Sequence, residues 1–146
     1  MMINLTDMKT VRSILGRHGF HFSKKLGQNF LIDPSVCPRI AEEGNAAAGY
    51  GVLEIGPGIG TMTQYLAYAA REVYAVEIDK SLIPILEDTL SDYDNVTVIN
   101  EDILKVDIAK LARREKWRPP DQSGCKSSIL YHDTDHYGFC LKAMCL

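Results

Sequence analysis

The sequence predicts an α/β domain built on a parallel β-sheet. Three apolar stretches, Gly51–Ile55, Glu72–Glu77 and Val96–Asn100, have the composition of strands, and helical patterns at residues 62–70 and 80–90 separate them. Strands that alternate with helices at this spacing form βαβ units with right-handed crossovers. The glycine-rich loop GPGIG follows the first strand directly and precedes a helix, which is a second indication of this fold class.

Length and charge describe one globular domain. The chain has 146 residues and a formal net charge of −3, and a chain of this length can bury a sizeable core. The negative charge excludes a uniformly basic nucleic-acid-binding protein, so such a role would need a local patch. There is no long apolar run and no secretory leader, so we expect a soluble cytoplasmic protein whose four cysteines stay reduced.

The first 33 residues form a basic arm. Thr6 or Asp7 can cap a helix that ends near Gly16 to Gly19. Five cations occur along this arm with no acid among them: Lys9, Arg12, Arg17, Lys24 and Lys25. Cations interleaved with aromatic and histidine side chains are typical of an RNA contact, because phosphates attract the cations and bases stack on the rings. A solvated helix face explains the same pattern equally well.

Two more helices complete the element order. Asp33 and Pro34 have the residue types of an N-cap and a first helical position, which predicts a helix from there to Glu43. Another helix is expected at residues 107–116, after the third strand. The second and third strands therefore each follow a crossover that contains a helix.

The glycines of the loop suit a ligand that approaches the backbone. Without Cβ atoms, Gly56, Gly58 and Gly60 let the chain turn sharply and let a ligand lie against the start of the next helix. In an open parallel sheet, ligands bind at the carboxyl ends of the strands, where this loop falls. Tight turns also contain glycines, so the loop alone is a weak indication.

Acidic residues at the ends of the next two strands make the prediction more specific. Glu77 ends the second strand, about 20 residues after the glycine loop, where an acid can bind the hydroxyls of a ribose. Asp102 follows the third strand, where its carboxylate can accept a hydrogen bond from an adenine amino group. The alternative is that both acids cap the helices that follow them. Together with the loop, they predict an adenosine bound across this edge of the sheet.

The residue before the loop distinguishes between adenosine cofactors. A dinucleotide fingerprint has the spacing G-x-G-x-x-G and places a pyrophosphate at the helix N-terminus. Here the spacing is G-x-G-x-G, and Glu54 precedes it. A carboxylate repels a pyrophosphate and suits a cofactor with a cationic amino-acid end, such as S-adenosyl-L-methionine. NAD remains the second candidate.

Four segments together resemble a known family. KKLGQNFLID, LEIGPGIGTMTQYLA, VYAVEID and NEDILKVD occur in the order seen in the ribosomal RNA small-subunit adenine-N6,N6-dimethyltransferases of the KsgA/RsmA type. The resemblance covers about Phe22 to Trp117. It implies a Rossmann-like S-adenosylmethionine-dependent methyltransferase fold, and an enzyme that dimethylates two adjacent adenines of small-subunit rRNA in the pre-30S particle, with no metal and no membrane.

The resemblance also implies roles for individual residues. Asn29 and Leu31 would close over the cofactor, with Gln28 beside them. Gly56 and Gly58 would lie under its methionine part, next to Glu54. The remaining cofactor residues would be Glu77 and Ile78 at the ribose, and Asp102 and Ile103 at the adenine. Arg17, Lys24 and Lys25 would contact RNA.

The chain departs from the family after Trp117. The family's catalytic motif, Asn-Leu-Pro followed by Tyr or Phe, should follow a fourth strand, where it accepts from the target amino group and stacks on the flipped adenine. This tetrapeptide is missing, so no catalytic residue is assigned. A zinc site made from Cys125, His132, His136 and Cys140 is a weak alternative, because their spacing matches no common zinc pattern.

A shifted reading frame explains the tail better. Codons that encode Lys126 to Gly138 can be chosen so that the next frame spells NLPYYITTPIIM, which contains the missing motif. We therefore expect residues 1–33 to be the basic arm and cofactor-closing loop, 34–117 a partial methyltransferase domain, and 118–146 an out-of-frame tail. The frame would change between Ala112 and Asp121.

Three functions follow from this organisation. The family activity is rRNA adenine-N6 dimethylation, but the printed chain, truncated after its third strand and lacking the motif, is expected to be inactive. One alternative is a non-catalytic remnant that binds adenosylmethionine or RNA. The other is a fragment of an NAD-dependent oxidoreductase.

Overall fold

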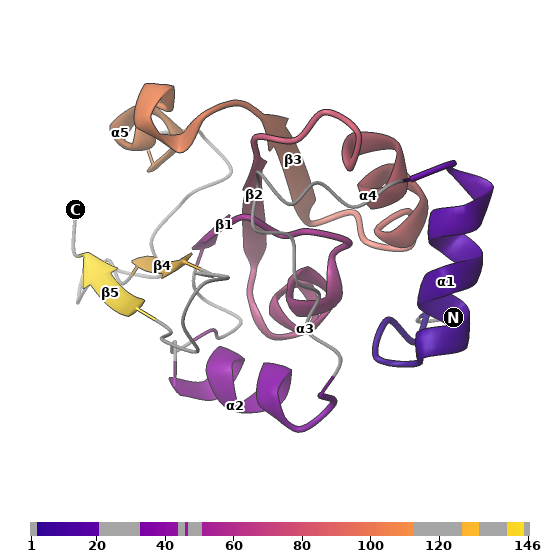
Figure 1. Ribbon diagram of the computed structural model, residues 1–146. Helices are drawn as coiled ribbons and strands as arrows, with labels where there is room; N and C mark the ends of the chain where they lie inside the picture. The colour runs from indigo at the N-terminus through magenta and orange to yellow at the C-terminus, as the bar shows by residue number, and fades with distance from the viewer. Residues whose placement is uncertain are drawn as a thin grey trace.

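Parallel strand pairing organises the protein. The computed structural model describes residues 3–20, 33–43, 46, 51–112, 127–131 and 140–144. Its sheet has the strand order β3-β2-β1-β4-β5 (Figure 1). The strands are β1 (Gly51–Ile55), β2 (Glu72–Glu77), β3 (Val96–Asn100), β4 (Ser127–Tyr131) and β5 (Cys140–Met144). All are parallel except β5, which runs antiparallel to β4. The expected α/β architecture is confirmed.

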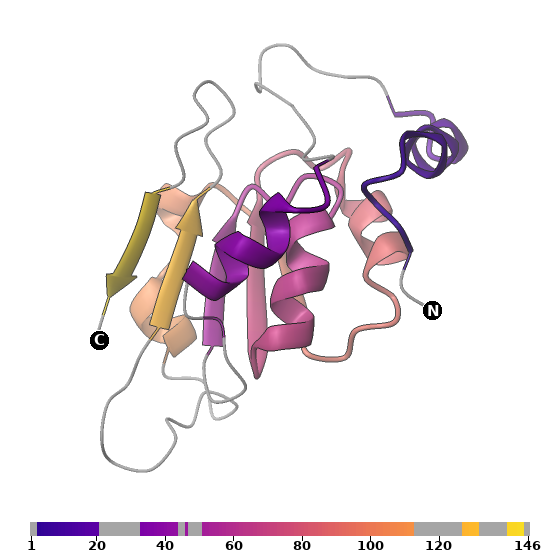
Figure 2. The ribbon, with the colours of Figure 1, turned by 90° about the horizontal axis from the view of Figure 1, so that it is seen from below.

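Helices cover both faces of this sheet. They are α1 (Met8–Arg17), α2 (Val36–Glu43), α3 (Thr61–Ala69), α4 (Ile83–Thr89), α5 (Ile108–Ala112) and the short 3-10 helix η2 (Ile103–Lys105). Figure 2 shows α2 and α3 in front of the sheet and α5 behind it. Among the described residues, no helix has the length and apolar character needed to cross a membrane.

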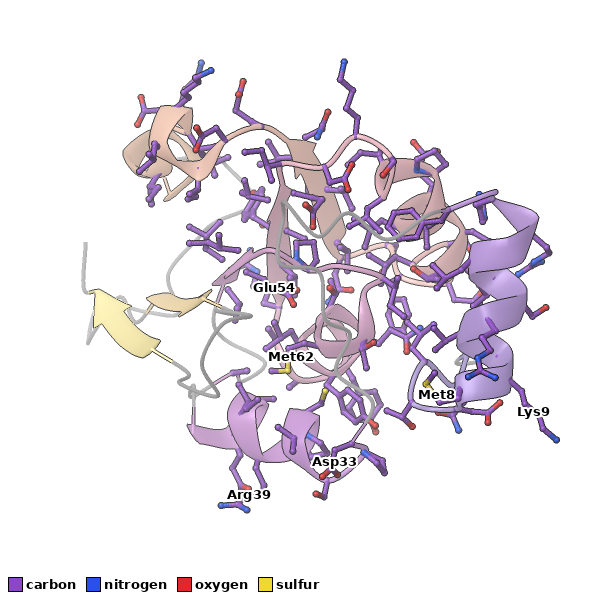
Figure 3. All side chains as sticks on the ribbon, in the orientation of Figure 1. Met8, Lys9, Asp33, Arg39, Glu54 and Met62 are labelled. Carbon is purple, nitrogen blue, oxygen red and sulfur yellow. The ribbon has the colours of Figure 1, made fainter. Side chains whose placement is uncertain are left out.

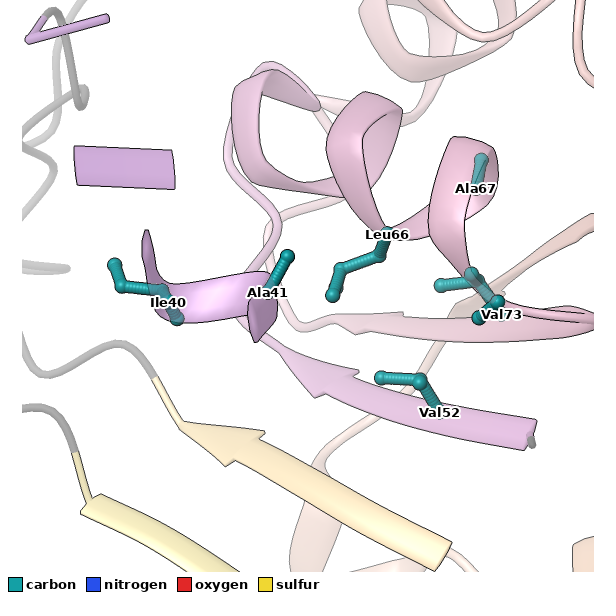
Figure 4. Packing of buried hydrophobic residues seen from close by; sticks show 7 residues of the cluster. Ile40, Ala41, Val52, Leu66, Ala67 and Val73 are labelled. Atoms are coloured by element: carbon teal, nitrogen blue, oxygen red, sulfur yellow. The ribbon is translucent and has the colours of Figure 1, made fainter. Parts of the chain in front are cut away.

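Alternation along the strands divides the core between the two faces. Val52 and Val73 pack against α2 and α3 in one cluster, part of which Figure 4 shows. Their neighbours in sequence, Leu53 and Tyr74, pack on the opposite face against side chains of η2 and α5. Successive side chains of a strand point to opposite faces, so apolar residues in a row predict a sheet that is buried on both sides.

The N-terminal helix packs on α4 rather than on the sheet. Asp7 caps α1, as expected, because its carboxylate accepts from the Thr10 N–H at 3.0 Å. The buried face of α1 then meets α4 and the glycine loop. That cluster contains Leu5, Val11, Ile14, Leu15, Ile59, Leu82 and Ile85. Helix α1 is therefore anchored to the loop that follows β1.

The expectation that the sheet ends after its third strand is corrected by the structure. Ser127–Tyr131 forms β4, which pairs in parallel with β1, and β5 pairs with β4. The physical reason is that an edge strand presents unpaired N–H and C=O groups, and a segment with β-forming residues such as Ile129 and Tyr131 can satisfy them. The edge of β1 is thus covered, not exposed.

Two helices begin later than the sequence pattern predicts. Helix α2 begins at Val36 because the Asp33 carboxylate accepts from the Ser35 N–H at 2.9 Å, which forms a turn before the helix. Helix α4 begins at Ile83, after the Asp79 carboxylate accepts from the Ser81 N–H at 2.9 Å. In both places a short acidic side chain competes with the helical hydrogen bonds of the backbone.

Candidate ligand site at the carboxyl ends of the strands

Three chain segments converge where the first three strands end. The loop after β1, the residues after β2 and those after β3 lie at the same sheet edge because the strands are parallel and in register. The Gly56 N–H donates to the Val76 carbonyl at 2.9 Å, and the Glu101 N–H donates to the Glu77 carbonyl at 3.1 Å. These bonds continue the sheet pattern beyond the strands. This edge is where ligands bind in open α/β sheets.

The glycine loop has a backbone that side chains would strain. Gly56, Gly58 and Gly60 have φ values of 74°, 62° and 89°, in the left-handed region that glycine adopts at little cost. Gly60 is also the N-cap of α3 and supplies no side-chain cap. The first N–H groups of α3 therefore lack a capping side chain from that residue, which suits a ligand with polar atoms.

Glu77 links the loop to the end of β2. Its carboxylate accepts from the Gly58 N–H at 3.2 Å and from the Asp79 N–H at 2.9 Å. The residue is 5% exposed. Burial raises the pKa of Glu77, and the two N–H donors oppose that rise. Glu77 thus shapes the loop, and its partly satisfied carboxylate lies at the site where a ribose was predicted.

Glu54 is the second buried acid of the site. Figure 3 shows it near the end of β1. It is 3% exposed, and its Oε2 atom has no hydrogen-bond partner in the described part of the chain. Burial raises the pKa of Glu54 to about 7; the nearby Thr63 hydroxyl opposes the rise, although it does not reach hydrogen-bond geometry, and the charge of Glu77 adds to it. A buried carboxylate without a partner is costly, so this position favours a cation.

Asp102 has the capping role that the sequence left open. Its Oδ1 atom accepts from the Leu104 N–H at 3.0 Å, and Asp102 is the N-cap of η2. It is half-buried, as is Ile103, and Ile78 is exposed. Asp102 and Ile103 follow β3, and Ile78 follows the neighbouring strand β2, so one acid and two apolar side chains come from adjacent strand ends. Capping and ligand binding are compatible, since each carboxylate oxygen accepts more than one bond.

Several predicted site residues lie outside the described part of the chain. They are Gln28, Asn29 and Leu31 of the closing loop, Lys24 and Lys25 of the basic arm, and the proposed zinc ligands Cys125, His132 and His136. Within the described residues, no group of His, Cys, Asp and Glu side chains could hold a metal ion. Arg17 is described, and its guanidinium lies 3.3 Å from the Asp88 carboxylate on α4.

Sequence reasoning missed the residues that hold the loop from behind. The Thr89 hydroxyl, at the end of α4, donates to the Ile59 carbonyl at 2.9 Å. The Gln64 side chain on α3 donates to the Thr89 carbonyl at 3.1 Å. No local signal could have found this pair of contacts, because Ile59 and Thr89 are brought together only by the packing of α4 on the loop.

Replacing Gly60 by alanine should destabilise the fold. A Cβ atom there would lie 3.2 Å from both Leu90 Cδ2 and Thr89 Oγ1 and 3.3 Å from Leu86 Cδ2, in addition to the unfavourable φ. We expect Gly60→Ala to lower the free energy of unfolding by about 1–3 kcal/mol, measured by urea denaturation. Gly16→Ala is the control: nothing lies within 4 Å of its Cβ position in α1, so the same measurement should show no loss. Equal stability of the two variants would contradict the strain.

Comparison with known proteins supports a methyltransferase fold. The chain is similar to the 23S rRNA methyltransferase ErmE, at 30% identity and a TM-score of 0.52 over 70% of this chain and 48% of that one. It also shares a fold with a dimethyladenosine transferase from Plasmodium falciparum, at 20% identity and a TM-score of 0.52 over 70% of this chain and 43% of that one. The Rossmann-like methyltransferase fold expected from the sequence is confirmed.

Curated relatives are closer in sequence. A protein of Lachnoclostridium phytofermentans called ribosomal RNA small subunit methyltransferase A is 58% identical over 120 residues, which is 82% of this chain and 41% of the relative. The protein of the same name from Bacillus licheniformis is 47% identical over 129 residues, 88% of this chain and 44% of the relative. The chain therefore spans about two fifths of the length of these relatives.

The family itself is identified by a match over most of the chain. The family described as ribosomal RNA adenine dimethylase matches residues 19–139. The matched range extends past Trp117, the end of the resemblance expected from the sequence. With its glycine loop, its acids at the strand ends and these relatives, the chain belongs to the ribosomal RNA adenine dimethylase family.

Proposed function

We propose that the chain is the cofactor-binding part of an rRNA adenine-N6 dimethyltransferase that uses S-adenosyl-L-methionine. The single observation that carries this is the meeting of the glycine loop with the buried acids Glu54 and Glu77 at one sheet edge. Its substrate would be two adjacent adenines of small-subunit rRNA, in the cytoplasmic pre-30S particle. The resemblance of the four sequence segments implies these details, and the name of the relatives supports small-subunit rRNA as the substrate.

The residues of the site fit this cofactor. The unpartnered, buried Oε2 atom of Glu54 suits the cationic ammonium of its methionine part. Gly56 and Gly58 leave room beside that part, and Glu77 would hold the ribose. Asp102, with Ile78 and Ile103, would hold the adenine. When bound, the cofactor supplies an electrophilic methyl group; the protein's own contribution is to orient it, because holding reactants in line lowers the barrier without a protein nucleophile.

Two further assignments would complete the site. Gln28, Asn29 and Leu31 would close over the cofactor and exclude water. Arg17, Lys24 and Lys25 would contact the RNA backbone through their positive charge. For Arg17, the ion pair with Asp88 is compatible with this, because the side chain is still 61% exposed and exposed ion pairs contribute little.

Binding of the cofactor is the first test. Calorimetric titration of the full chain with S-adenosyl-L-methionine should show one site, and NADH should not compete for it. Glu77→Gln should weaken binding about 10- to 100-fold, because it removes a charged acceptor. Glu72→Gln is the matched control, since Glu72 is also a buried acid of β2 but lies at the opposite end of the strand from the site. Competition by NADH would favour the oxidoreductase alternative, and no binding of either would reject the proposal.

Affinity for the cofactor should depend on pH through Glu54. The pKa of Glu54 is raised to about 7, and only the ionised form attracts an ammonium. As pH falls through 7 the carboxyl takes up a proton, so the dissociation constant should rise about fivefold between pH 7 and pH 6. Glu54→Gln should bind more weakly, with an affinity that is flat over this range. A wild-type affinity that is equally flat would show that Glu54 does not bind the cation.

The stability of the free protein should depend on pH in the opposite direction to the cofactor affinity, which provides a second test of the role of Glu54. A carboxyl whose pKa is raised on folding stabilises the fold most below its unfolded pKa, and this contribution is lost as pH rises through about 7. Glu54→Gln should therefore raise the melting temperature at pH 8 relative to the wild type. At pH 4, where Glu54 is mostly protonated in both states, the two melting temperatures should nearly coincide.

We further propose that the tail at residues 118–146 is read out of frame. The support is the missing Asn-Leu-Pro motif and the codons that restore it in the neighbouring frame. Pairing of residues 127–131 with β1 shows only that this segment can occupy the edge. On this view the printed chain binds the cofactor without transferring its methyl group.

Sequencing the DNA across the codons for Lys110 to Lys126 tests the reading frame. A gained or lost base there is the expected result, and the corrected frame should then spell the motif. An unchanged frame would mean that the printed tail is the encoded one. In that case the absence of methyl transfer to rRNA would be a property of the gene product.

A further inference from the structure

Neighbouring side chains in the last turn of α4 point in different directions. Asp88 is directed to α1, where its carboxylate lies 3.0 Å from His18 Nε2 and 3.3 Å from the Arg17 guanidinium. The next residue, Thr89, is directed inward and is 2% exposed. One turn of helix therefore connects the N-terminal helix with the glycine loop. Because Thr89 is buried, its hydroxyl must find its hydrogen-bond partner inside the protein.

The Thr89 hydroxyl holds the backbone of the glycine loop. It donates to the Ile59 carbonyl at 2.9 Å, and the carbonyl of its own helix at Leu86 is farther away, at 3.5 Å. A threonine in a helix often bonds back to its own helix, so the preference for Ile59 is informative. The backbone carbonyl of Thr89 accepts from the Gln64 side chain on α3 at 3.1 Å. Loop, α3 and α4 are thus joined through one residue.

The loop is held from two sides. On the sheet side, Glu77 accepts from the Gly58 N–H. On the helix side, Thr89 binds the Ile59 carbonyl, and the Ile59 side chain is 1% exposed among residues of α1 and α4. Gly60 approaches Thr89 so closely that a Cβ atom would contact its hydroxyl at 3.2 Å. The direction of the peptide groups between Gly58 and Gly60 is set by these two contacts.

We propose that Thr89 is a positioning residue for cofactor binding: it aims the glycine loop without touching the ligand. This rests on the function proposed above. Without the hydroxyl donor, the buried Ile59 carbonyl has no hydrogen-bond partner among the described residues, and the peptide can rotate toward one. Rotation would turn the neighbouring loop amides away from the ligand. The free energy of the lost hydrogen bond would then appear partly as weaker cofactor binding.

A hydroxyl-specific set of variants tests this in the full chain. Thr89→Val keeps the size and shape of the side chain and removes the donor, whereas Thr89→Ser keeps the donor and removes a methyl group. Ser91→Ala is the matched control, because the Ser91 hydroxyl also donates to a backbone carbonyl, that of Asp88 at 3.0 Å, but at an exposed position of the same helix end. Affinity for S-adenosyl-L-methionine is measured by calorimetry.

The expected result is a graded loss that follows the donor. Thr89→Val should raise the dissociation constant about tenfold, the size of effect that one buried hydrogen bond allows. Thr89→Ser and Ser91→Ala should stay within about twofold of the wild type. Should the valine variant fail to fold, Thr89→Cys replaces it, because a thiol is a weaker donor than a hydroxyl. Its dissociation constant should be higher than those of the wild type and of Thr89→Ser, but binding should not be lost completely. Equal affinities of valine and wild type, or equal losses for serine and valine, would overturn the proposal.

Amide hydrogen exchange in the free protein gives a readout that does not need the cofactor. In Thr89→Val the loop amides between Gly56 and Gly60 should exchange faster, while amides of β2 and β3 keep their wild-type rates. Uniformly faster exchange would mean a general loss of stability and would overturn the positioning role. If wild-type protein does not bind the cofactor but the loop alone loosens in Thr89→Val, the proposed function fails and the positioning of the loop stands.

Discussion

The hydrogen bond from the Gly56 amide to the Val76 carbonyl is the contact on which the site depends. It extends the pairing of β1 with β2 by one step, into the glycine loop. That step brings the loop beside Glu77, whose carboxylate then binds the Gly58 amide. Glu54 pairs with Ala75, two residues before Glu77, so both acids lie on the same face of the sheet; if the register slipped by one residue, they would lie on opposite faces and the site would not form. Strand register, a property of the core, thus determines the chemistry at the sheet edge.

Burying two carboxylates at the site is energetically unfavourable, and a cationic ligand can offset this. Two acids, Glu54 and Glu77, lie buried near one another. Burial raises the pKa of each, and the charge of Glu77 raises the pKa of Glu54 further. Folding alone would be better served by apolar residues at these positions. A cationic ligand reverses this balance, because the cost of burying the carboxylate has already been met before binding. Such local conflict between stability and environment is typical of functional sites.

Much of the fold and of the candidate site could be predicted from the sequence, because the relevant signals are local. The glycine loop, the acid after each of two strands and the alternation of strands with helices are read within short windows. Residue type also narrowed the N-cap of α1 to Thr6 or Asp7, and the structure shows that it is Asp7. Errors arose where two local signals compete: Asp33 and Asp79 each form a turn with a serine two residues later, so that α2 and α4 begin later than the apolar pattern suggests. The closing loop and the basic residues Lys24 and Lys25 lie outside the described residues and stay predictions.

By itself, the sequence determined the order of the elements from α1 to β3, the family and the residue types at the strand ends, because periodicity and short motifs carry that information along the chain. Only the tertiary structure decided which polar atoms are satisfied. Among the described residues, Glu77 has two N–H donors while the Oε2 atom of Glu54 has none, and the Thr89 hydroxyl lies closer to the Ile59 carbonyl than to the Leu86 carbonyl of its own helix. The tertiary structure also paired residues 127–131 with β1. Hydrogen-bond partners distant in sequence depend on how whole elements pack, and no local pattern encodes that.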